Sequence, residues 1–174
     1  MNVKKTLILI LSLTFTLVSA IPNISGAGEK PKAVEKLEQC TSDISKELES
    51  LGVIFQKATE QKDKNKALSL LLLQKQTNHA LSMIYDSMAF LLLYGNLDHD
   101  CKTQSVRIIN NRLLYSRDIL ISITEEMSNW QITLSREGQA DLSESYRRIV
   151  IPMIKAKNTL VNITHFMGPL YDQP

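Results

Sequence analysis

The fold is decided by residues 70–93, which read LLLLQKQTNHALSMIYDSMAFLLL. Apolar or small side chains recur there at steps of three or four residues: Leu70, Leu73, Thr77, Leu81, Ile84, Met88 and Leu91. A mean step of about 3.5 residues is typical of helices that pack along a left-handed seam, whereas a half-buried strand alternates at every second residue. Residues 70–93 therefore predict a long helix with one face in a core.

Three further stripes with the same spacing lie before and after this one, over residues 34–58, 106–130 and 142–167. Short polar or glycine-containing breaks separate the stripes, at residues 62–65, 95–96 and 136–138. Short connections make consecutive helices antiparallel. We therefore predict an all-α fold, an up-down-up-down four-helix bundle with long helices over residues 32–168.

The N-terminal residues 1–20, MNVKKTLILILSLTFTLVSA, have the three parts of an export signal. Lys4 and Lys5 precede an apolar core, and small residues follow it up to Ala20. We predict cleavage of this signal peptide after Ala20 and a secreted or periplasmic protein. Residues 21–31 then form a flexible leader, residues 169–174 form a C-terminal tail, and no mature segment has the ~20 apolar residues of a membrane span.

The mature chain is expected to carry no net charge. The 174 residues include 20 Lys and Arg against 18 Asp and Glu, and Lys4 and Lys5 account for the excess. A protein that binds nucleic acid by neutralising phosphates needs a surplus of basic residues. We therefore expect no nucleic-acid partner.

The chain contains two cysteines, Cys40 and Cys101. An even number in an oxidising compartment favours a disulfide, and both residues lie early in helices that begin at the same end of the predicted bundle. Those two helices are diagonal in a square bundle, which opposes a bond that needs Cα atoms within about 7 Å. We predict a Cys40–Cys101 disulfide. The alternatives are two buried thiols or a redox site, for which the C-x-x-C spacing is missing.

Motifs of common enzymes are missing from the sequence: it has no G-x-S-x-G, no H-E-x-x-H and no glycine-rich phosphate loop. We therefore expect a protein that is not an enzyme, with no catalytic residues and no cofactor. The most polar cluster is Asp98, His99 and Asp100, with His165 expected at the same end of the bundle. Such side chains are ligands of zinc or copper, but the spacing matches no known metal motif. We interpret them as helix-capping and surface residues instead.

The second helix has more apolar surface than one seam requires. Residues 70–73 cover nearly a whole turn with leucine, and residues 91–93 nearly repeat this. One interpretation is a wide core face packed on two neighbouring helices. The other is a contact with a second protein or a second copy of the chain, made by the exposed parts of Leu70, Leu71, Leu72, Leu73, Leu91, Leu92 and Leu93.

The sequence thus favours a secreted, non-enzymatic protein-binding or structural module. One alternative is a binder of a small ligand or metal, with a pocket at Pro152, which should kink the fourth helix, or at the His99 and His165 end. The other is a eukaryotic secreted signalling bundle. Glycans on Asn23 or Asn162 would favour that source, since each residue begins an Asn-x-Ser/Thr tripeptide.

Overall fold

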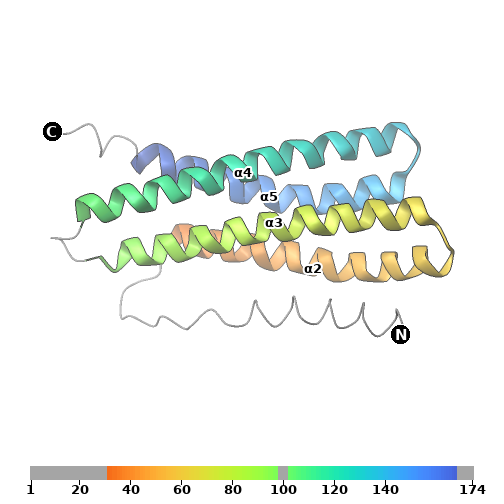
Figure 1. Cartoon of the computed structure of the whole chain (residues 1–174), viewed down its shortest axis with the longest axis horizontal. Coiled ribbons are helices and arrows are strands. Elements are labelled where there is room, and N and C mark those ends of the chain that lie inside the picture. The colour runs from red at the N-terminus through yellow and green to blue at the C-terminus, as the bar shows by residue number, and fades with distance from the viewer. Residues whose placement is uncertain (1–30, 98–101, 168–174) are drawn as a thin grey trace.

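The computed structural model describes residues 31–97 and 102–167. These ranges contain four α-helices and no strand: α2 (Lys32–Glu60), α3 (Lys64–Gly95), α4 (Lys102–Arg136) and α5 (Ala140–Met167) (Figure 1). The prediction of an all-helical fold with four long helices is therefore confirmed. The expected signal peptide, residues 1–20, and the expected tail, residues 169–174, lie outside the described residues.

Each helix runs antiparallel to the one before it, as Figure 1 shows. α2 packs on α3, α3 on α4 and α4 on α5, and α2 closes the ring by packing on α5. α3 and α5 also touch across the ring, where the hydroxyl of Tyr146 donates to the carbonyl of Ser69 at 3.4 Å. α3 and α5 therefore form the short diagonal of the bundle, and α2 and α4 lie at the ends of the long one.

The turns after α2 and α4 share one backbone form. After α2, Lys62 has a φ of 58°, and the N–H of Asp63 donates to the carbonyl of Ala58 at 2.9 Å. After α4, Gly138 has a φ of 74°, and the N–H of Gln139 donates to the carbonyl five residues before it, also at 2.9 Å. Both turns are Schellman motifs, in which one left-handed residue ends the helix and its last carbonyls find donors.

The core extends along the bundle and follows the predicted stripes. Thr77 and Ser87 lie in it because each hydroxyl donates to the backbone carbonyl four residues earlier, at 2.7 Å. Among its fully buried large side chains are Leu37, Ile44, Leu73, Ile84, Ile109, Leu113, Leu120, Met127, Ile149, Met153 and Leu160.

The predicted third stripe is wrong at its last member, because Trp130 is 46% exposed. From Met127 the seam passes through Gln131, whose amide donates to the hydroxyl of Ser143 on α5 at 3.2 Å. It then reaches Leu134, which is buried. A step of four residues instead of three therefore turns Trp130 away from the core.

Replacing Gly138 with Ala is expected to lower the free energy of unfolding by about 1 kcal/mol, because an L side chain is strained at a positive φ. Nothing lies within 4 Å of the added Cβ, so no steric clash adds to the backbone strain. Lys62→Gly is the matched variant in the same kind of turn. It should raise the free energy of unfolding by roughly 0.5 kcal/mol, since relieved strain exceeds the added chain entropy. Urea unfolding measures both changes, and two changes of equal sign would contradict this account.

Candidate functional site

The seven leucines predicted as a contact surface divide between the core and the outside of α3. Leu70, Leu73 and Leu91 are buried in the core, and Leu92 is half-buried against it. The exposed members of the set are Leu71, Leu72 and Leu93, at 45%, 47% and 50%. The last three have the largest surface of the set open to a partner.

Leu68 is a further exposed leucine of α3, at 58%, which the sequence reasoning missed. It begins a second row of residues at steps of four and three along the outside of the helix, and every member of that row is exposed. We call this row the outer stripe: Leu68, Leu72, Lys75, His79, Ser82, Asp86, Ala89 and Leu93. The heptad spacing of the outer stripe was the signal that could have identified Leu68. Ser69 separates Leu68 from the continuous leucine run 70–73, on which the prediction was based.

Charge is scarce on α3 and in the residues directly after it. Between Lys66 and Leu97 the formal charges are Lys75 and Asp86 alone. Within the described part of the chain, neither of these two side chains forms an ion pair or a side-chain hydrogen bond. Despite this apolar character, none of the described helices has the long apolar stretch that crossing a bilayer requires.

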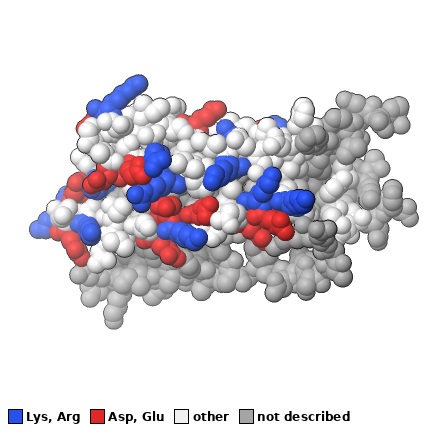
Figure 2. Space-filling model, turned by 180° about the vertical axis from the view of Figure 1, so that it is seen from behind, with Lys and Arg blue, Asp and Glu red and all other residues white. Residues whose placement is uncertain are grey.

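Figure 2 shows the bundle from behind the view of Figure 1. On that face, charged side chains of both signs lie in mixed order. On α5, the Glu144 carboxylate accepts from Arg147 Nε at 2.7 Å and from Arg148 Nε at 3.0 Å. These two hydrogen bonds, Arg147 first, lower the pKa of Glu144 to about 2. Glu144, Arg147 and Arg148 thus find their ion-pair partners within α5.

A shallow hollow of about 270 Å³ lies between α2 and α5 beside Pro152, where the sequence suggested a pocket. Pro152 is buried inside α5. Side chains of both signs line the hollow: Asp43, Lys46, Glu47, Arg148 and Lys155, with Ile151. Because the cationic and anionic groups are interspersed, the hollow presents no single charge to a ligand.

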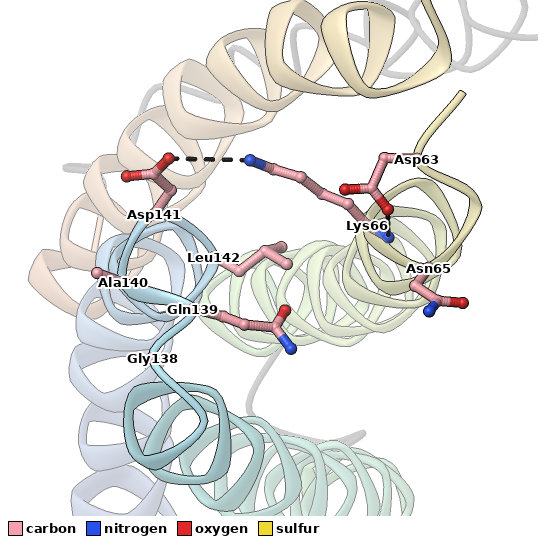
Figure 3. Close-up of a pocket in the computed structure, with 8 residues that line it drawn as sticks. All are labelled: Asp63, Asn65, Lys66, Gly138, Gln139, Ala140, Asp141 and Leu142. Atoms are coloured by element: carbon pink, nitrogen blue, oxygen red, sulfur yellow. Dashed lines mark hydrogen bonds and ion pairs between the residues drawn. The ribbon is translucent and has the colours of Figure 1, made fainter. Parts of the chain in front are cut away.

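A second hollow of about 450 Å³ lies where the α2–α3 and α4–α5 turns meet (Figure 3). Three of its polar residues, Asp63, Lys66 and Asp141, take part in interactions at the helix ends. The Asp63 carboxylate caps α3 by accepting from the N–H of Lys66 at 3.0 Å. Lys66 Nζ lies 3.8 Å from a carboxylate oxygen of Asp141 in the first turn of α5. The hollow contains no histidine, cysteine or serine side chain that could act as a base or nucleophile.

The structure describes only one of the four residues considered as metal ligands. His165 is exposed on α5, whereas Asp98, His99 and Asp100 lie outside the described residues. Over residues 31–97 and 102–167, no three His, Cys, Asp or Glu side chains are grouped so that they could hold a metal ion.

Cys40 is buried on α2. As a thiol it has a pKa raised above its ordinary value, first by burial and then by the charge of Asp43, with Lys155 acting in the opposite direction. Cys101 lies outside the described residues, so the Cys40–Cys101 disulfide stays a prediction. α2 and α4 occupy the long diagonal, which is the arrangement that the sequence reasoning counted against the bond.

The disulfide can be tested on the unfolded chain. If Cys40 and Cys101 are bonded, iodoacetamide adds no group to the denatured protein until a reductant is supplied, and then adds one group to each cysteine. Intact mass spectrometry counts these groups. Alkylation of both cysteines without reductant would show that they are free thiols.

The Glu144 carboxyl is expected to titrate at about pH 2 in the folded protein, against 4.5 for the free group. Because the folded-state pKa is the lower one, the ion pairs stabilise the fold above pH 4.5, and this contribution is lost as the pH falls toward about 2. NMR titration of the side-chain carboxyl gives the midpoint. Arg147→Gln should raise it, while Arg107→Gln on α4 should leave it unchanged. A midpoint near 4.5 in the unmodified chain would contradict the pairing.

Comparison with known proteins identifies no relative: no family model matches the chain, and no curated protein or solved structure shows significant similarity to it.

Proposed function

We propose that the chain is a secreted, non-enzymatic module that binds an amphipathic helix of a protein partner along the outer stripe of α3. The supporting observation is the outer stripe itself. Each of its residues is exposed, leucines stand at both of its ends, and only Lys75 and Asp86 carry formal charge within it. Secretion rests on the sequence of residues 1–20.

The shape of the outer stripe favours a helix as the partner. From Leu68 to Leu93 it extends roughly 37 Å along a straight helix at 1.5 Å per residue. Its members recur at steps of three and four, which is the spacing at which one helix presents anchors to another. A small ligand would need a concave site, and the outer stripe is the convex side of a single helix.

The second candidate function is ligand binding in the hollow beside Pro152. It is favoured by the position of this hollow, at the proline where a pocket was predicted. Native mass spectrometry of the protein purified from its own compartment tests it, because a retained mass beyond the polypeptide is expected.

A signalling role depends on a eukaryotic source. Asn162 is exposed on α5, as a glycosylated residue must be.

Photo-crosslinking tests the binding face. A benzophenone side chain placed at Leu72 or Ala89 should form an adduct with a discrete protein in the native compartment. The crosslinked peptide, read by mass spectrometry, should lie on the apolar side of a helix. Gln39 on α2, also exposed, is the control position and should give no such adduct. Equal adducts from both faces, or none from α3, would overturn the proposal.

A further inference from the structure

The outer stripe has an internal symmetry that points to its partner. Leu68 lies seven residues before Lys75, and Leu93 lies seven residues after Asp86. Leu72 lies seven residues before His79, and Ala89 lies seven residues after Ser82. Residues equally far from the two ends of the outer stripe are therefore similar, apolar with apolar and polar with polar. The charged pair differs in sign, because Lys75 corresponds to Asp86.

We infer that the outer stripe binds the outer stripe of a second copy of this chain in antiparallel orientation, so that the protein self-associates through α3. The inference rests on the proposed function, since it names the helix that the outer stripe takes. A two-fold axis passing between Ala80 and Leu81 pairs Leu68 with Leu93 of the second copy, and Leu72 with Ala89 of the second copy. Such a contact is self-complementary and closes as a dimer.

The two charges of the outer stripe, Lys75 and Asp86, select the antiparallel orientation. Antiparallel pairing places Lys75 opposite Asp86 of the second copy, and places Asp86 opposite Lys75 of the second copy. Parallel pairing in register would instead set Lys75 against Lys75 and Asp86 against Asp86. Like charges in contact disfavour that arrangement, and polar groups in such seams commonly fix orientation.

These charges cannot satisfy each other within one chain. Lys75 and Asp86 are eleven residues apart on α3, roughly 16 Å along the helix, which is beyond the ~10 Å over which salt leaves exposed charges coupled. No ion pair within the described residues joins either of them. A second copy supplies both with partners at once.

The centre of the stripe makes the expected dimer reversible. Lys75, His79, Ser82 and Asp86 separate the leucines at the two ends, so the apolar contact is divided into two short segments. One helix pair also gives an interface at the small end of the range for specific complexes, where association is weak. We therefore expect a monomer–dimer equilibrium that depends on protein concentration.

Charge exchange tests the pairing by sedimentation equilibrium on the full mature chain. Lys75→Asp and Asp86→Lys should each weaken dimerisation by about tenfold, because each puts like charges at two symmetric contacts. The double variant Lys75→Asp/Asp86→Lys should recover the original dimer constant. The control Lys36→Asp alters an exposed lysine of α2 and should change nothing. Additive losses in the double variant would overturn the antiparallel pairing.

Cysteine placement gives a test of orientation that does not depend on charge. In the antiparallel dimer the two Ser82 positions are about 4.5 Å apart along the helix axis, and the two Leu93 positions about 37 Å. Ser82→Cys should therefore form an intermolecular disulfide under oxidation, and Leu93→Cys should not. Parallel pairing would crosslink both variants, and crosslinking of neither would contradict dimerisation through α3.

Apolar contact is tested by Leu68→Glu, which should abolish the dimer while circular dichroism shows an intact fold. Val161→Glu on α5 is the matched exposed substitution and should leave the dimer unchanged.

The self-association is overturned if the unmodified chain stays monomeric at protein concentrations up to about 1 mM, because a dimer with a Kd of about 1 mM would be detected there. If benzophenone at Leu72 then still captures the helix of another protein, the proposed binding function survives. If it captures none, both fail.

Discussion

The packing of α3 against all three other helices is the constraint on which the rest of the structure depends. In a ring each helix touches two neighbours, but α3 also meets α5 across the short diagonal, where Tyr146 reaches the backbone at Ser69. Close approach of this kind needs small side chains at the contact. Thr77, Ala80 and Ser87 are small residues of α3, and all are fully buried. Leu70 and Leu73 lie in the core, and the turn of about 100° per residue along the helix directs Leu71 and Leu72 outward.

Periodicity predicted much of this fold, since it reports which residues share a face. The four stripes and the three breaks between them correspond to the four helices and their connections. It failed at Trp130, where the choice between a step of three and a step of four depends on the partner helix, here the contact of Gln131 with Ser143. Which diagonal pair of helices is in contact could not be predicted either, because this depends on how closely the side chains let the helices approach. Neither property is local in the sequence.

The candidate surface was predicted in its location but only partly in its residues. A run of four leucines indicates surplus apolar area, yet it does not say which members face outward, because neighbouring residues on a helix are about 100° apart. Burial separates Leu71 and Leu72 from Leu70 and Leu73. Leu68 belongs to the same surface, but in the sequence it stands apart from the run, beyond Ser69. The heptad rule identifies it once the outer side is considered as a seam of its own.

The distribution of charge explains why α3 differs from α5 as a surface. Arg147 and Arg148 follow Glu144 by three and four residues, so these three charges of α5 pair with one another within the helix. Lys75 and Asp86 are too far apart for this, and the leucines beyond them lie exposed in two separate groups. Each group is small enough to be tolerated in water, since only larger continuous apolar patches are rare on monomers. A second helix that covers both groups must also meet the charges between them, so a matching partner places an anion opposite Lys75 and a cation opposite Asp86.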